Sequence, residues 1–234
     1  MHKHAGRMVV AVALVALGGC SSAADGGDDH PADPQARLDA AGDILDRTQG
    51  VRFNVQGDGL PSEGTVVVSA EGVAVPPASF DGDVRITTAG LAATLGVISV
   101  GGELWARLPF ANDFARVDAG SLGFGDPGAL IDPDQGVSLL LKSGSQVTAG
   151  DQVRVDGQVL DQVESVLPGS LVGDVLTIAD PAADVHALWS LDPGSGELRR
   201  AVLTGPFYPS GGEQTYTVRL TDYDEPVEIS APSS

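Results

Sequence analysis

Side chains that could carry out chemistry are few in this chain, apart from its carboxylates. The 234 residues include one cysteine, Cys20, and four histidines, of which only His186 lies in the region with the pattern of a folded domain. A hydrolase needs a nucleophile, a base and an orienting group, and a zinc site needs several His or Cys ligands. His186 alone supplies neither. The sequence therefore predicts no catalytic residue, no metal site and no cofactor.

The carboxylates suggest two further chemistries, and neither is favoured. Residues 132–136 (DPDQG) are superficially like a calcium loop, but Gly144 falls near the place of the bidentate Glu that ends such a loop. A glycosidase pair depends on a separation in space that the sequence does not give. Carbohydrate sites usually offer aromatic platforms, and the only tryptophans are Trp105 and Trp189. We therefore predict that the chain is not an enzyme.

Cys20 stands where a cysteine is modified by lipid. Lys3 and Arg7 precede an apolar run at 8–17, which is the layout of an export signal and is shorter than the roughly 20 residues that span a bilayer. The residues at 17–20 (LGGC) resemble the bacterial lipobox. We expect cleavage directly before Cys20 and a membrane anchor of two or more acyl chains on it, which is a stable attachment. A lone cysteine also excludes an internal disulfide.

The net charge and the sequence after Cys20 predict the class of partner and the bounds of the folded domain. After removal of a signal peptide at 1–19, 32 acidic residues face 11 basic ones, a net charge of −21. Such a surface repels phosphate backbones, so nucleic-acid binding is not expected. Residues 20–34 contain the lipidated cysteine and a stretch rich in Asp, Gly, Ser and Pro, which predicts a flexible acidic tether. The folded domain is expected at 35–232.

Apolar spacing predicts a β-rich domain with three helices. Three- and four-residue periods predict helices at 34–49, 134–142 and 158–167, with Asp132 or Asp134 capping the second. Two-residue alternation on short turns predicts an antiparallel meander of about ten to eleven strands. The expected strands lie at 51–56, 64–70, 83–88, 91–100, 103–108, 114–118, 151–157, 185–191, 197–205, 214–223 and 227–230.

Several of these strands are apolar on both faces, as in Val66-Val67-Val68. One face of an antiparallel sheet normally meets water, so both faces here need a cover. A curved sheet with helices on one side could leave a gap for an apolar ligand. A core filled by its own side chains is the alternative, and the residues alone leave both open.

Four segments in order give the chain a family resemblance. They are residues 100–106 (VGGELWA), 130–141 (LIDPDQGVSLLL), 187–192 (ALWSLD) and 220–232 (LTDYDEPVEISAP). With the lipobox, the acidic tether and the opening helix, they resemble the LppX, LprA, LprF and LprG family of mycobacterial and related actinobacterial cell-envelope lipoproteins. The resemblance covers essentially the whole mature domain.

The resemblance implies an α+β fold in one domain, a curved antiparallel half-barrel with helices on its concave side and a hydrophobic cavity between them, similar to the carriers LolA and LolB. It also implies a lipid-anchored protein on the outer face of the cell membrane that binds and carries acylated glycolipid or phospholipid. An envelope lipid transporter is left open as a further partner. A structural or adhesive lipoprotein with a filled core, bound to a protein partner, is the alternative function.

The family supplies no short ligand motif, so cavity-wall residues are taken from strand alternation. Each candidate competes with plain core packing. The loop at 169–184 and the insert at 205–212 depart from the family pattern and are expected to alter the cavity mouth. The candidate lipid-binding residues are Phe53, Val55, Val66, Val68, Val84, Ile86, Val97 and Leu104.

Overall fold

The computed structural model describes residues 33–122 and 125–232. Cys20, the signal peptide predicted at 1–19 and all but the last two residues of the tether predicted at 20–34 lie outside the described residues. The predictions of cleavage and lipid attachment therefore stay predictions.

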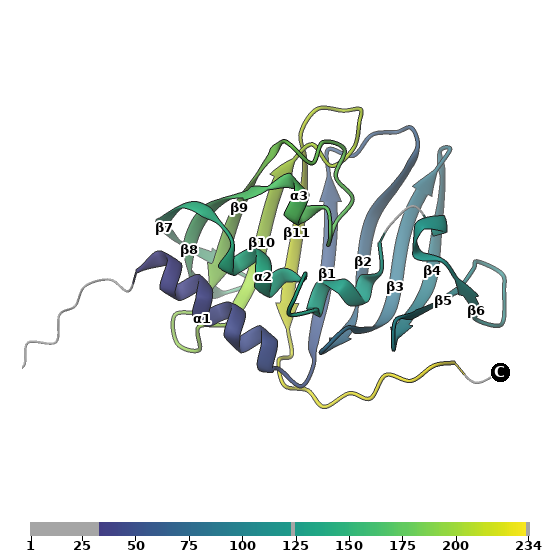
Figure 1. Cartoon of the computed structure of the whole chain (residues 1–234), viewed down its shortest axis with the longest axis horizontal. Coiled ribbons are helices and arrows are strands. Elements are labelled where there is room, and N and C mark those ends of the chain that lie inside the picture. The colour runs from purple at the N-terminus through teal and green to yellow at the C-terminus, as the bar shows by residue number, and fades with distance from the viewer. Residues whose placement is uncertain (1–32, 123–124, 233–234) are drawn as a thin grey trace, which may run out of the picture. The chain divides into compact units, whose positions relative to one another are not determined.

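The fold is built on one antiparallel sheet of eleven strands in the order β6-β5-β4-β3-β2-β1-β11-β10-β9-β8-β7 (Figure 1). Two meanders, β1 to β6 and β7 to β11, are joined where β1 pairs with β11. This confirms the predicted fold class of a curved antiparallel sheet with a few helices. The strands are β1 Val51–Asp58, β2 Thr65–Val75, β3 Ser79–Thr88, β4 Leu91–Val100, β5 Glu103–Arg107, β6 Ala115–Val117, β7 Ser145–Val155, β8 Gln158–Pro168, β9 Asp184–Leu191, β10 Leu198–Gly205 and β11 Gln214–Thr221.

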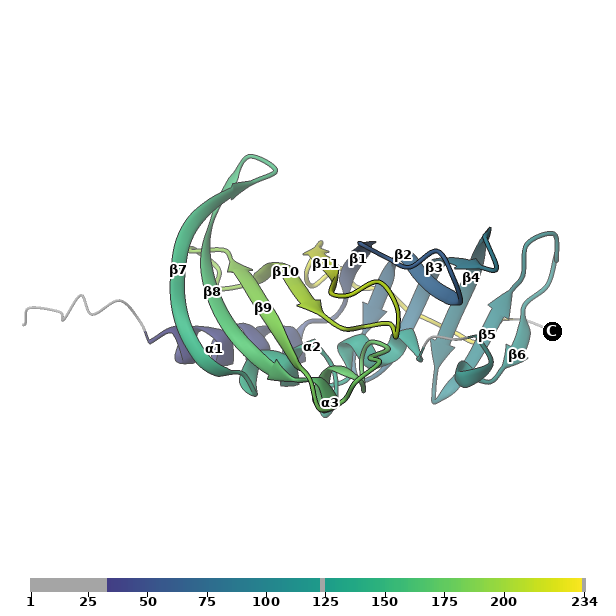
Figure 2. The same cartoon turned by 90° about the horizontal axis from the view of Figure 1, so that it is seen from above.

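The helices lie together on one face of this sheet (Figure 2). They are α1 Pro34–Arg47, the 3-10 helices η1 Ala119–Leu122 and η2 Pro127–Ile131, α2 Val137–Lys142 and α3 Gly169–Val172. α1 packs on α2, β7 and β10, and α3 packs on β8 and β9. η2 packs on β2, β3 and β4. The two meanders therefore have different covers.

α1 begins where its sequence predicts. The Asp33 carboxylate accepts the N–H of Gln35 at 3.3 Å, and Pro34 occupies the first turn, where its missing N–H costs nothing. The apolar stripe of α1 then buries Leu38 and Leu45. Gly42 allows α2 to approach closely, because a Cβ there would meet the Ser138 carbonyl oxygen at 3.1 Å.

The helix predicted at 158–167 is wrong, because these residues form β8. Val163, Ser165 and Leu167 all point inward with a period of two. The alternation is not evident in the sequence, because Ser165 is a polar residue in a buried position. Its hydroxyl is satisfied there by the indole N–H of Trp189, at 2.8 Å.

Two smaller predictions also fail. The strand predicted at 227–230 is irregular chain, because β1 already pairs with β2 and β11 and offers no free edge. The helix predicted at 134–142 starts only at Val137, and neither Asp132 nor Asp134 caps it. Asp132 instead closes a turn, in which its carbonyl oxygen accepts the N–H of Gly136 at 2.6 Å.

Candidate functional site

A small apolar hollow lies between the sheet and its cover at β1 to β3. Its volume is about 60 Å³, which is room for about two water molecules. Below it are Val55, Val67, Ala70 and Val84 of the sheet. η2 and the segment after α3 close the other side through Pro127, Leu130, Val175, Leu176 and Thr177. We call this space the hollow.

The hollow exists because its cover is short. η2 has five residues, so it presents little apolar surface to the three strands beneath it. It approaches the sheet closely at Gly128, where a Cβ would meet the carbonyl oxygen of Ala78 and the hydroxyl of Ser99, each at 2.8 Å. The carboxylate of Asp126 fixes the start of η2 by accepting the Gly128 N–H at 2.8 Å. The cover is thus anchored at one end and leaves space beside it.

The strands β1 and β2 separate next to the hollow. β1 and β2 pair only as far as Gln56 and Ser69. Beyond that point β1 stays with β11 as far as Asp58, and β2 stays with β3 as far as Thr65. A β-bulge in β2 between Val67 and Ser69 accompanies the separation. We call the place where β1 and β2 separate the split.

Two tyrosines close the split by satisfying the backbone of Val67. The Val67 N–H donates to the Tyr208 hydroxyl at 2.9 Å, and the Tyr216 hydroxyl donates to the Val67 carbonyl oxygen at 2.8 Å. The two hydroxyls are 2.8 Å apart. Since Tyr216 gives its only proton to Val67, Tyr208 donates to Tyr216. Each of these four polar groups therefore has a partner, in what we call the hydroxyl ring.

Gln214 and Phe207 hold the tyrosines of the hydroxyl ring in place. The buried side chain of Gln214 accepts the N–H of Tyr208 at 3.0 Å and donates to the carbonyl oxygens of Ser210 and Gly212. The ring of Phe207 packs edge-on against Tyr216, with 5.0 Å between ring centroids. Burial raises the pKa of Tyr216 far above its ordinary value. Tyr216 therefore stays protonated and keeps donating to Val67.

Comparison with known proteins identifies the family. The sequence model of the LppX_LprAFG lipoproteins matches residues 33–229. The chain belongs to this family. That confirms the resemblance predicted from its sequence. Among its relatives is the lipoarabinomannan carrier protein LprG of Mycolicibacterium hassiacum, 27% identical over 179 residues, which are 68% of this chain and 72% of that one.

Two solved structures show the LppX_LprAFG fold. LprF from Mycobacterium bovis is similar to this chain with a TM-score of 0.69 and 13% identity, over 86% of this chain and 97% of LprF. LppX from Mycobacterium tuberculosis is similar with a TM-score of 0.58 and 17% identity, over 84% of this chain and 98% of LppX. At this identity the likeness concerns the fold.

The structure places the candidate lipid-binding residues of this LppX_LprAFG domain in three groups. Val55 and Val84 line the hollow. Phe53, Ile86, Val97 and Leu104 are buried on the same face of the sheet, away from the hollow lining. Val66 is buried and Val68 is half-buried, but neither lines the hollow. The residues of β2 that line it are Val67 and Ala70.

The bulge in β2 explains why Val67 lines the hollow in place of Val66 and Val68, because it shifts which side chains of β2 face inward. The alternation of residues in the sequence does not reveal a bulge. Both segments expected to alter the cavity mouth contribute to the hollow, 169–184 through Val175 to Thr177 and 205–212 through Tyr208. Sequence reasoning missed Tyr216, although it continues the inward alternation of Val218 and Leu220.

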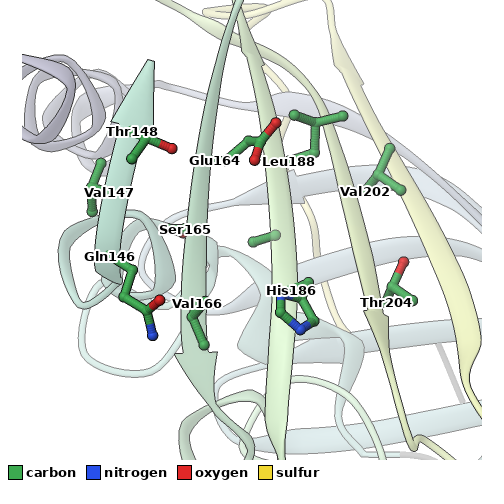
Figure 3. Close-up of a pocket in the computed structure, with 11 residues that line it drawn as sticks. Gln146, Val147, Thr148, Glu164, Ser165, Val166, His186, Leu188, Val202 and Thr204 are labelled. Atoms are coloured by element: carbon green, nitrogen blue, oxygen red, sulfur yellow. The ribbon is translucent and has the colours of Figure 1, made fainter. Parts of the chain in front are cut away.

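A second, open groove crosses the other face of the sheet over β7 to β10, with a volume of about 620 Å³ (Figure 3). Glu164, His186 and Thr204 point into it beside Leu188 and Val202. The mixture of polar and apolar side chains and the wide opening suit a surface contact better than the enclosure of an acyl chain. His186 is exposed there and has no catalytic arrangement around it.

The described part of the chain shows neither a metal centre nor a membrane-spanning helix. Residues 33–122 and 125–232 hold no group of three or more His, Cys, Asp or Glu side chains that could bind a metal ion. Within those same residues, every helix is too short or too polar to cross a bilayer.

Proposed function

We propose that this lipoprotein binds acylated lipid in the hollow and carries it between layers of the cell envelope. Its lipid-anchored Cys20 would hold it on the outer face of the cell membrane, and it would perform no catalysis. Membership of the LppX_LprAFG family and the apolar lining under a short cover support this role. Glycolipid is the favoured ligand class, since one relative is named a lipoarabinomannan carrier.

The single observation that carries the proposal is the contrast between lining and cover. The sheet side of the lining is apolar valine and alanine apart from Tyr216, whereas the cover is a five-residue 3-10 helix and irregular chain. A volume of about 60 Å³ is far below the roughly 300 to 1,000 Å³ of ligand sites. Lipid binding therefore requires the cover to move outward. Burying a chain gains about 0.8 kcal/mol per methylene, which favours such a movement.

Lipid extraction from the purified full-length protein tests the proposal. Ala70→Phe fills the hollow from the sheet side, and Ala92→Phe places the same side chain at an exposed position of β4. Mass spectrometry of organic extracts should find bound acyl lipid in the unaltered protein and in Ala92→Phe, and several-fold less in Ala70→Phe. Equal amounts in all three proteins, matching the detergent background, would contradict the proposal.

The anchor is tested separately. Cells fed an alkyne-labelled fatty acid should label the full-length protein, and Cys20→Ser should abolish the label. A labelled Cys20→Ser protein would show that the acyl chain is attached elsewhere.

The open groove favours a second function, attachment to an envelope protein. Its size of about 620 Å³ exceeds that of the hollow, and most of the interior is filled by side chains. This function predicts a partner that crosslinks through the groove and dissociates with rising salt, because the chain is strongly acidic. Val202→Arg should abolish it and leave extracted lipid unchanged.

A further inference from the structure

The hydroxyl ring is the boundary that a lipid entering the hollow must meet. Tyr208, Tyr216 and Val67 belong both to the ring and to the lining of the hollow. The split lies next to the hydroxyl ring and is covered by Leu60. A Cβ added to Gly57 of β1 would lie 2.8 Å from Leu60 Cδ1 and 2.9 Å from Tyr216 Cε1, so both side chains pack closely there. The hollow can therefore lengthen between β1 and β2 only if the tyrosine side chains move.

Moving the tyrosines leaves polar groups without partners. The Val67 N–H and carbonyl oxygen face the split instead of a neighbouring strand, because β1 no longer pairs with β2 there. Tyr216 is 2% exposed and Tyr208 8% exposed, so water does not replace a lost bond at low cost. Each buried group without a partner is expensive, whereas exchanging one hydrogen bond for another is nearly neutral. A ligand that only brings hydrocarbon leaves this cost uncompensated.

We propose that Tyr208 and Tyr216 make this site select lipids that carry an oxygen, as hydroxyl or ester, where the acyl chain begins. The oxygen takes a place in the hydroxyl ring and bonds to a tyrosine hydroxyl or to the Val67 N–H, while the chain occupies the lengthened hollow. Tyr208 and Tyr216 are thus the specificity-determining residues of the site. The inference rests on the proposed function, since it assumes that the hollow takes up lipid.

A competition between two matched probes tests it. The full-length protein in detergent is offered equal amounts of 1-octadecanol and octadecane, which differ by one hydroxyl oxygen, and native mass spectrometry counts the bound molecules of each. The unaltered protein should prefer the alcohol. Tyr208→Phe and Tyr216→Phe should each lower the ratio of bound alcohol to bound alkane by about tenfold, the effect of one buried hydrogen bond.

Tyr223→Phe is the matched control. Tyr223 is half-buried and also donates to a backbone carbonyl, that of Leu198 at 2.7 Å, but it does not line the hollow. Its variant should keep the preference of the unaltered protein. Each phenylalanine variant is tested singly, so one that fails to fold leaves the other to decide.

An unchanged ratio in a folded Tyr208→Phe or Tyr216→Phe protein, with lipid still bound, would overturn the selectivity and leave the carrier role standing. An unaltered protein that takes up neither probe would overturn both together.

Discussion

The two ends of the sheet are covered in different ways, and the hollow lies at one of them. At the filled end, α1 and α3 pack on β7 to β10, and α2 packs on α1. At the hollow end, η2 and the segment at 173–178 lie over β1 to β4. The filled end is sealed by large side chains that are almost completely buried, among them Leu38, Leu45, Leu141, Leu160, Leu167 and Trp189.

The difference shows how one sheet can serve both stability and binding. A helix of several turns brings a continuous apolar stripe to the sheet and fills the interior. A 3-10 helix of five residues brings fewer side chains and fewer backbone bonds, so the hollow end opens at lower cost. Stability should therefore depend on the filled end and ligand uptake on the hollow end.

The largest expected effect is at the filled end. Leu141→Ala removes a side chain of α2 that is 0% exposed and leaves a new closed cavity in a tightly packed region. We expect a loss of about 4 kcal/mol in the free energy of unfolding, measured by urea denaturation. The amount of lipid extracted per folded molecule should not change.

The matching substitution at the hollow end should cost less. Leu130 lies on η2, is 5% exposed and lines the hollow, so Leu130→Ala enlarges a space that already exists. We expect a loss of about 2 kcal/mol and more extracted lipid than from the unaltered protein. Equal losses for the two variants would mean that the ends do not differ in packing.

The filled end could be predicted from sequence only in part. The stripe of α1 and the alternation of β9 and β10 appear directly in the residues. β8 was mistaken for a helix because Ser165 interrupts its buried face. The hydroxyl of Ser165 accepts a hydrogen bond from Trp189, 24 residues further along the chain. A local sequence pattern does not include such a distant partner.

The hollow end was predicted in outline only. Strand alternation found Val55 and Val84, whose neighbours on the sheet follow a regular period. It did not find Val67, because the bulge in β2 changes the register there. It did not find the hydroxyl ring either, since Val67 and Tyr208 are 141 residues apart and meet only through the pairing of β1 with β11.

The hydroxyl ring should make a smaller contribution to stability than either leucine. Tyr216→Phe leaves the Val67 carbonyl oxygen without its donor, and we expect a loss of about 1 kcal/mol in the free energy of unfolding. Urea denaturation of Tyr216→Phe and Tyr223→Phe side by side measures it. A gain in stability for Tyr216→Phe would indicate that the ring is strained rather than stabilising.

The smallest effect concerns charges that join α1 to α2 at the filled end. The Lys142 ammonium lies 2.7 Å from Asp43 Oδ1 and 2.7 Å from Asp46 Oδ2. The hydrogen bond from Lys142 lowers the pKa of Asp43, and the hydrogen bonds to Asp43 and then Asp46 raise the pKa of Lys142. Asp43 is exposed and the other two groups are half-buried, so solvent screens part of the interaction.

The direction of both shifts fixes the pH dependence. The Asp43 contribution is fully present above the ordinary pKa of 3.8 and is lost as pH falls through the lowered value. The Lys142 contribution is present below the ordinary pKa of 10.5 and is lost as pH rises through the raised value. Lys142→Met should therefore lower the urea midpoint between these limits and converge with the unaltered protein outside them.

Arg116→Met provides the control for Lys142→Met at the other end of the sheet. Arg116 pairs with Glu103 at 2.7 Å, but their side chains are 67% and 40% exposed, and no helix is joined by the contact. The urea midpoint should stay unchanged at every pH, because an isolated surface pair contributes little. If Arg116→Met and Lys142→Met behave alike, the bridge between α1 and α2 does not help to seal the filled end, and its apolar side chains alone account for the difference between the two ends.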